Sequence, residues 1–335
     1  GKLGGRELNF SSDIDVIVAY PAGGESDGPR SLDALTYFNR LSRDIVTLID
    51  DVTEEGLVFR TDTRLRPFGE SGPPVVSFAA LESYLLKHGR DWERYAYVKA
   101  RLVGRRPRES VRRELFEELI NPFVYRRYLD FGVFESLREI HVKIAVEVAR
   151  RDRVDDLKLG PGGIREVEFL VQSLQLVRGG SLPELQSPSL LAVLPELVEA
   201  NTMAKADADR LLAAYLWLRR LENLVQAMRD KQTHALPVDA NDRARLVFAL
   251  GCDDWQALRR EYEEHRAAVT AQFGTVAFPD RADAVRASDY ATHWSESAPV
   301  ERWQTLLESR DVGDAAVIAS RIVDFRSLSA AQQAD

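Results

Sequence analysis

Gly1-Lys-Leu-Gly-Gly-Arg-Glu-Leu-Asn-Phe-Ser-Ser-Asp13-Ile-Asp15-Val-Ile-Val-Ala-Tyr20 is a glycine-rich turn followed by an apolar stretch that carries two aspartates. The apolar run predicts a buried strand that begins near Asp13. Residues two apart on a strand point to the same face, so Asp13 and Asp15 are expected side by side. Two adjacent carboxylates repel each other unless they share a cation, and Mg²⁺ suits such a site. The alternatives are a chance Asp-x-Asp and turn chemistry ahead of the strand.

A second strand is predicted from Gly56 to Pro67, and its two faces differ in character. Leu57, Phe59, Thr61, Thr63 and Leu65 share one face, whereas Val58, Arg60, Asp62, Arg64 and Arg66 share the other. Burying an aspartate flanked by arginines against apolar groups is costly. This face is therefore either a solvated edge strand with salt-bridged charges or in contact with an anion. We favour the anion, with Asp62 as a third carboxylate and the arginines as phosphate ligands.

Composition narrows the class of protein. With 335 residues, 45% of them hydrophobic, the chain is long enough for two domains and an appendage. A single cysteine, Cys252, excludes a disulfide framework and predicts a reducing cytoplasm. No apolar run is long enough to span a bilayer, so no membrane is expected, and the net charge of −8 disfavours nucleic acid as a partner. Because the chain begins without Met and inside a motif, we expect a piece of a longer polypeptide.

Beyond the second strand the apolar spacing is mostly helical. A first helix is expected at about 32–48, before that strand, and Ser77 is positioned to cap a helix over 78–85. Further helices are expected at 91–102, 111–120, 124–151, 164–177, 189–199 and 206–231, and two short ones in 279–335.

Two polar stripes interrupt the apolar helices. After the tight turn Gly160–Gly163, Arg165, Glu168, Gln172 and Gln175 lie on one face of a helix. This stripe is either ordinary surface, or Arg165, Glu166 and Glu168 face a catalytic cleft, since a helix N-terminus binds anions. The second stripe, Arg219, Glu222, Asn223 and Gln226, is interpreted as structural.

Several long motifs together resemble one family. The opening turn with Asp13-Ile-Asp15, the segment Arg64-Leu-Arg-Pro-Phe-Gly-Glu-Ser-Gly72 and the segment Gly162-Gly-Ile-Arg-Glu-Val-Glu-Phe169 resemble bacterial glutamine synthetase adenylyltransferases. Gly89–Tyr95, Val98–Arg101 and 123–138 extend the resemblance, which therefore spans most of the first 278 residues. Glu7-Leu-Asn-Phe10 and Phe68-Gly-Glu-Ser71 resemble the amino-terminal, adenylyl-removing unit of that family.

The resemblance implies a fold and an activity. The fold class would be α+β, with a small mixed nucleotidyltransferase sheet and flanking helices followed by a larger helical bundle, as in the DNA polymerase β-like superfamily. The domains would be a truncated catalytic domain at 1–105, a bundle at 106–278 and a helical connector at 279–335. Inorganic phosphate would attack adenylylated glutamine synthetase and release ADP, under the control of the PII signal protein.

The resemblance also assigns roles to residues. Asp13, Asp15 and Asp62 would be catalytic and would hold two Mg²⁺ ions. Neither Gly1-Lys2 nor Gly4-Gly5 matches the superfamily turn in both spacing and residue type, so the glycines that approach phosphate stay open. The predicted phosphate- and nucleotide-binding residues are Gly1, Lys2, Gly4, Gly5, Ser11, Ser12, Arg60, Arg64, Arg66, Arg165, Glu166 and Glu168.

Two other functions remain open on the sequence. One is an adenylyltransferase that moves AMP from ATP to a protein tyrosine or an RNA end. The other is a non-catalytic module that binds a nucleotide or a partner, which Asp13, Asp15 and Asp62 together disfavour.

Overall fold

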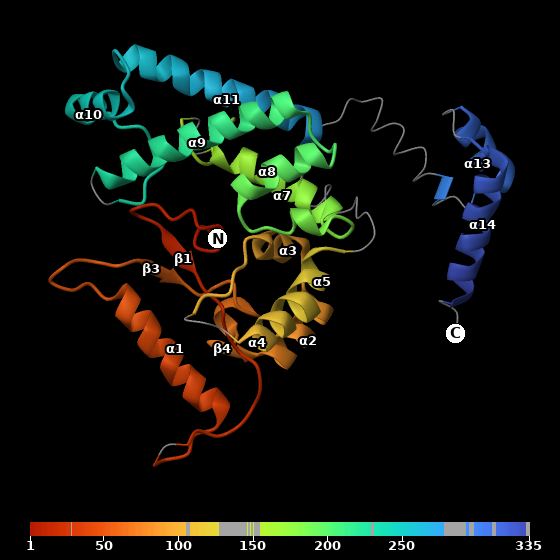
Figure 1. The fold of residues 1–335 in the computed structure, drawn as a ribbon, viewed down its shortest axis with the longest axis horizontal. Coiled ribbons are helices and arrows are strands. Elements are labelled where there is room, and N and C mark those ends of the chain that lie inside the picture. Colours follow the sequence, from red (N-terminus) through yellow and green to blue (C-terminus); the bar gives the residue numbers. More distant parts are fainter. Residues whose placement is uncertain are drawn as a thin grey trace. The chain divides into compact units, whose positions relative to one another are not determined.

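The computed structural model describes residues 1–27, 29–104, 108–126, 146, 148, 150, 155–228, 231–277, 293–294, 298–309 and 313–332. The chain divides into two compact units, Gly1–Ala277 and Phe278–Asp335 (Figure 1). Among the described residues, no helix is both long enough and apolar enough to cross a membrane.

Two short parallel strand pairs form the sheet region. Strand β1 (Asp13–Asp15) pairs with β3 (Arg60–Asp62), and β2 (Val18–Tyr20) pairs with β4 (Val75–Ser77). The α+β class is confirmed, but the described strands form two parallel pairs instead of one mixed sheet. The predicted strand also breaks after Asp15, because the chain leaves β3 and joins β4; Val16 N makes a last bond to Asp62 O, at 2.8 Å.

The second predicted strand is much shorter than Gly56–Pro67. Strand β3 contains only Arg60–Asp62, so the long alternation was wrong beyond these residues. The strand ends at Asp62 because its carboxylate accepts a hydrogen bond from Arg64 N, at 2.8 Å, and turns the backbone. The guanidinium of Arg66 then donates to Thr63 O and Thr63 Oγ1, at 2.9 and 2.7 Å, and holds this turn.

Helix α1 (Ala34–Asp50) confirms the first predicted helix and begins at Asp33, whose carboxylate accepts from Thr36 N at 3.0 Å. Its apolar stripe is less covered than amphipathic spacing suggests. Leu41 and Ile45 are about two-fifths exposed and Leu48 is 77% exposed.

The next helices connect the sheet region to the bundle. Ser77 caps α2 (Phe78–His88) as predicted, since its hydroxyl accepts from Ala80 N at 3.2 Å. Helix α3 (Asp91–Val98) ends four residues earlier than expected. The helix predicted at 111–120 is confirmed as α4 (Glu109–Arg113) and the π-helical turn Glu114–Ile120, which continue into α5 (Asn121–Val124). The helix predicted at 124–151 lies mostly outside the described residues.

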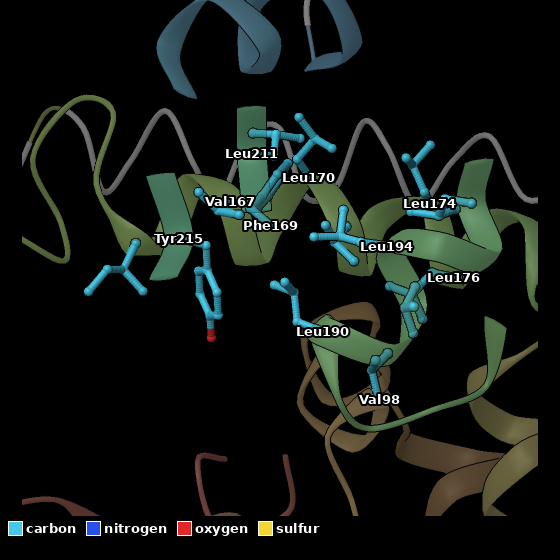
Figure 2. Close-up of a cluster of buried hydrophobic side chains, with 14 of the residues drawn as sticks. Val98, Val167, Phe169, Leu170, Leu174, Leu176, Leu190, Leu194, Leu211 and Tyr215 are labelled. Atoms are coloured by element: carbon cyan, nitrogen blue, oxygen red, sulfur yellow. The ribbon is translucent and has the colours of Figure 1, made fainter. Parts of the chain in front are cut away.

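Five longer helices form the bundle of the first unit. Helices α7 (Ile164–Arg178), α8 (Leu190–Glu199) and α9 (Lys205–Ala227) confirm three predictions, whereas α10 (Ala240–Leu250) and α11 (Trp255–Ala277) were not predicted. Short 3₁₀ turns occur at Gly69–Ser71 and Pro183–Leu185. Figure 2 shows the packed interior, where Val167 and Leu170 of α7 lie near Leu211 and Tyr215 of α9.

The second unit has a small core of its own. Its helices are α13 (Val300–Glu308) and α14 (Ala315–Gln332), so the two helices expected in this region are confirmed and the second is longer. Trp303, Leu306 and Leu307 of α13 pack with Ala315 and Ala319 of α14.

Candidate active site

The two aspartates of β1 face one cavity of about 390 Å³ in the first unit. The glycine turn supplies Gly1 and Lys2 to its wall, and Ser12 lies just before β1. The helices that complete the wall are α3, through Trp92, Tyr95 and Ala96, and α7, through Arg165, Glu168, Phe169 and Gln172. The period-two prediction that Asp13 and Asp15 lie side by side is therefore confirmed.

The third predicted carboxylate, Asp62, is adjacent in the sheet. In the β1–β3 register, Asp15 is the Cα partner of Asp62 and Asp13 is the partner of Arg60. The Asp62 carboxylate is bound by Arg64, with Nε 3.0 Å from both oxygens and Nη2 2.5 Å from Oδ2. This hydrogen-bonded guanidinium holds the pKa of Asp62 below its ordinary value.

Both carboxylate oxygens of Asp13 also accept hydrogen bonds from side chains. Arg60 Nε donates to Oδ1 at 2.7 Å, and Gln232 Nε2 donates to Oδ2 at 2.9 Å. The same Arg60 reaches Ser11 Oγ at 3.2 Å. Asp15, by contrast, accepts no hydrogen bond from a side chain of the described residues.

The donor chemistry of the three aspartates suits Mg²⁺, which prefers carboxylate oxygens. Their arrangement does not yet form a metal-binding group: within the described ranges, no three His, Cys, Asp or Glu side chains are grouped to hold a metal ion. Two of the three carboxylates are neutralised by Arg60 and Arg64 instead. A metal ion bound here would have to replace these arginine contacts.

The glycine turn is pressed against the end of α3. A Cβ atom built on Gly4 would lie 1.7 Å from the carbonyl oxygen of Lys99, and one on Gly5 would lie 3.2 Å from Pro188 O. Arg101 donates to Leu3 O and Gly4 O, at 2.8 and 3.2 Å. Glycine at position 4 is therefore needed for contact with protein backbone, whereas a Cβ atom at position 5 would require only a small shift.

A buried ion cluster fixes the turn to α7. Lys99 Nζ lies 3.0 Å from Glu7 Oε2 and 2.6 Å from Glu168 Oε1, and Tyr215 Oη donates to Glu7 Oε2 at 2.9 Å. Burial alone would lower the pKa of Lys99, but the charges of Glu168 and Glu7 outweigh it and raise that pKa. Burial would likewise raise the pKa of Glu168, and Lys99 outweighs this and lowers it. The cluster therefore keeps its charges.

A second network fixes the turn to α9. The Glu222 carboxylate, which is fully buried, accepts from Lys2 Nζ at 3.0 Å and from Asn9 Nδ2 at 2.8 Å, and it also binds Arg219. Burial would raise the pKa of Glu222, but bonds from His234 and Asn9 and the charges of Arg219 and Lys2 hold it well below its ordinary value. The stripe on α9 is thus structural, as predicted, and its role is to hold the segment before β1.

The α7 stripe divides among three environments. Arg165, Glu168 and Gln172 line the cavity. Glu166 instead accepts from Gly162 N, at 3.0 Å, and Gln175 donates to Leu185 O at 2.6 Å.

The remaining predicted residues lie at the edges of the site. Ser12 lines the cavity and accepts from Asn9 N at 3.2 Å, whereas Arg66 donates to nearby backbone oxygens. Sequence reasoning did not assign Trp92, Lys99, Lys158, Gln232 or His234 to the cavity. They come from three separate segments, and local periodicity does not show which distant segments meet.

The sequence of this chain matches known family models and curated proteins. Residues 1–115 match a family model described as glutamate-ammonia ligase adenylyltransferase, and residues 138–277 match one described as GlnD PII-uridylyltransferase. The chain is 46% identical, over its whole length, to the bifunctional glutamine synthetase adenylyltransferase/adenylyl-removing enzyme of Stenotrophomonas maltophilia strain K279a, of which it covers 36%. It is 49% identical, over 88% of its length, to the enzyme of the same name from Xanthomonas oryzae pv. oryzae strain MAFF 311018, of which it covers 31%.

The chain thus spans about a third of the length of the curated relatives that it matches, and it corresponds to their amino-terminal part. The turn and the aspartates lie within the first matched range, and the α7 entry lies within the second. By these matches the chain belongs to the glutamine synthetase adenylyltransferase family.

Proposed function

We propose that this chain removes AMP from adenylylated glutamine synthetase by phosphorolysis. Phosphate would attack the phosphorus of the adenylyl-tyrosine, the bond from phosphorus to the tyrosine oxygen would break, and that oxygen would take a proton from water. The products would be ADP and unmodified tyrosine. The relatives are named for both adding and removing an adenylyl group, and the resemblance of Glu7–Phe10 and Phe68–Ser71 to the adenylyl-removing unit favours removal.

The observation that carries the proposal is the charge arrangement of one cavity. Asp13 and Asp15 enter it from β1, and Lys158 and Arg165 enter it from other segments. A phosphate dianion that approaches a phosphodiester needs cationic groups to offset the repulsion, and such a transfer depends on positioning and charge neutralisation more than on covalent catalysis.

In this proposal, the arginines in and just after β3 bind phosphate. Arg60 and Arg64 neutralise Asp13 and Asp62, and a guanidinium binds phosphate in the same bidentate manner as a carboxylate. We propose that Asp13, Asp15 and Asp62 hold Mg²⁺ when Arg60 and Arg64 turn to phosphate. The metal would supply charge stabilisation for the attacking and leaving oxygens.

The test supplies adenylylated glutamine synthetase, Mg²⁺ and phosphate to the chain and measures nucleotide products by chromatography. Release of ADP, strictly dependent on phosphate, is expected. Release of AMP without phosphate would indicate hydrolysis and contradict the proposal. Asp15→Asn should lower the rate by about 100-fold or more, whereas Asp44→Asn, on the exposed face of α1, should leave it unchanged.

The same assay tests the alternatives. An adenylyltransferase would instead transfer labelled AMP from ATP to unmodified glutamine synthetase. A non-catalytic module would do neither and would still bind nucleotide. Uridylylated PII, added to the phosphorolysis assay, tests the regulation that the resemblance implies: a faster release of ADP is expected.

A further inference from the structure

Gln172 is a buried polar residue whose side chain has no protein partner among the described residues. It lies on α7, is only 3% exposed, and lines the cavity that contains Asp13 and Asp15. No hydrogen bond joins its amide to the described chain. The glutamine one turn further on behaves differently, since Gln175 Nε2 donates to Leu185 O at 2.6 Å and Ser187 O at 2.9 Å.

An amide that is removed from bulk water without a partner destabilises the fold. Such a group is retained where an occupant of the cavity completes its hydrogen bonds. A glutamine amide offers one acceptor oxygen and an NH₂ donor close together. Its natural partner is therefore a planar edge on which a donor and an acceptor are adjacent.

Aromatic and aliphatic side chains line the same cavity. Trp92 on α3 is 41% exposed and has no ring partner within the described part of the chain, and Leu65, Tyr95 and Phe169 also line the cavity. Two contacts tie the two helices together: Lys99 with Glu168, at 2.6 Å, and the rings of Tyr95 and Phe169, with centroids 6.2 Å apart. Trp92 lies one turn before Tyr95, and Gln172 lies one turn after Glu168.

The combination of an exposed indole face and a buried amide suits a nucleobase. Aromatic side chains stack on bases, and a glutamine amide pairs with adenine by accepting from the 6-amino group and donating to the neighbouring ring nitrogen. The carboxylates and cations of the cavity remain for the phosphate end. A cavity of about 390 Å³ falls within the usual size of a small-molecule site.

We propose that Gln172 recognises the 6-aminopurine edge of the adenylyl group and that Trp92 stacks on its ring. This inference rests on the proposed function for the identity of the nucleotide, and adds the part of the cavity that selects the base. The 6-amino group then determines selectivity, because a purine that lacks it leaves the Gln172 carbonyl oxygen unpaired.

The test measures equilibrium binding of AMP and of purine riboside 5′-monophosphate, which lacks only the 6-amino group, by calorimetry. The wild-type chain should bind AMP about tenfold more tightly. Gln172→Leu should remove this preference by weakening AMP more than purine riboside 5′-monophosphate, which loses only the hydrogen bond to its ring nitrogen. Gln256→Leu, at an exposed position of α11, is the matched control and should retain the preference.

Substitution of Trp92 tests the stacking contact. Trp92→Ala should weaken both nucleotides by about tenfold, and Trp92→Phe should restore most of the affinity. Thermal unfolding of each variant shows whether it is folded. If Gln172→Leu does not fold, Gln172→Glu, which keeps the acceptor oxygen and loses the donors, should weaken both nucleotides, because the ring nitrogen loses its hydrogen bond.

The outcomes separate the two proposals. A wild-type chain that binds both nucleotides equally, or binds neither, overturns the base subsite. So does a folded Gln172→Leu that retains the preference, or a folded Gln172→Glu that binds both nucleotides as tightly as the wild type. If the preference for AMP is found but adenylylated glutamine synthetase yields no ADP, only the proposed reaction fails. If ADP is formed without any preference for the 6-amino group, only the base subsite fails.

Discussion

Gly4 is the residue at which the opening turn meets the bundle. Its substitution by alanine would place a methyl group 1.7 Å from the carbonyl oxygen of Lys99. The atoms that this methyl group would meet are backbone atoms, which cannot rotate away as a side chain could. The turn would have to move, and with it the segment that leads to Asp13. We expect Gly4→Ala to lower the free energy of unfolding by about 1–3 kcal/mol, measured by urea denaturation, and to slow ADP release.

The matched control is Gly104→Ala, since a Cβ atom at Gly104 would meet nothing within 4 Å. It should unfold at the same urea concentration as the wild type. Equal midpoints for Gly4→Ala and Gly104→Ala would show that the contact between turn and α3 is not tight.

Lys2 gives the turn a pH dependence. Burial lowers the pKa of Lys2 to about 8 from 10.5, although the charge of Glu222 acts in the opposite direction. Unfolded Lys2 keeps its proton up to about pH 10.5, so unfolding takes up a proton between pH 8 and 10.5, and this contribution to stability rises with pH. The free energy of unfolding of wild type minus that of Lys2→Met should therefore increase across this window in urea titrations. A constant or falling difference would contradict the assignment.

For single residues, the sequence predicted which side chains share a face but not which groups they bind. The period of two placed Asp13 and Asp15 together, and the cavity contains both. Arg60 and Arg64 were predicted as phosphate ligands, and alternation does not show that each binds an aspartate directly, as in the structure. Gln172 belonged to a recognised stripe, but only tertiary contacts distinguish it from Gln175.

At the scale of elements, the junction of β4 and α2 depends on one hydroxyl. Ser77 ends β4 and caps α2 through Ala80 N, at 3.2 Å. Ser77→Ala removes this bond and should lower the free energy of unfolding by about 1 kcal/mol, read from the midpoint of urea unfolding. Ser110→Ala, at an exposed position of α4, should stay within about 0.5 kcal/mol of the wild type. Equal losses in both variants would show that the cap contributes nothing.

The elements also show where periodicity is a good guide. Helices α1, α7, α8 and α9 were predicted within two residues at their first turns, because each has sustained apolar spacing. Periodicity did not predict burial in α1, where the six residues of β3 and β4 are too few to cover the whole apolar stripe of Leu41, Ile45 and Leu48. Periodicity also overestimated the length of the second strand, because it does not show the turn, fixed by Asp62 and Arg66, that ends β3.

At the scale of the whole molecule, the site depends on contacts that are distant in sequence. Lys2 meets Glu222, and Lys99 meets both Glu7 and Glu168, so the residues of the sheet region and of the bundle share one buried set of charges. The predicted domain boundary at residue 105 places Lys2, Glu7 and Lys99 in one domain and Glu168 and Glu222 in the next. In the structure, all five belong to one compact unit. Such charge pairs are not visible in a sequence, since each member reads locally as a solvated residue.

The two compact units have separate hydrophobic cores, and this gives a last prediction. The core of the first unit contains residues between Val76 and Phe273, whereas that of the second contains residues between Ala298 and Ala319. Among the described residues, none belongs to both cores, so we expect the first core to form without the second. A chain of residues 1–277 should therefore keep the main thermal transition of the 335-residue chain and its affinity for AMP, measured by calorimetry. A large fall in the transition temperature, or a loss of AMP binding, would show that the second unit stabilises the site.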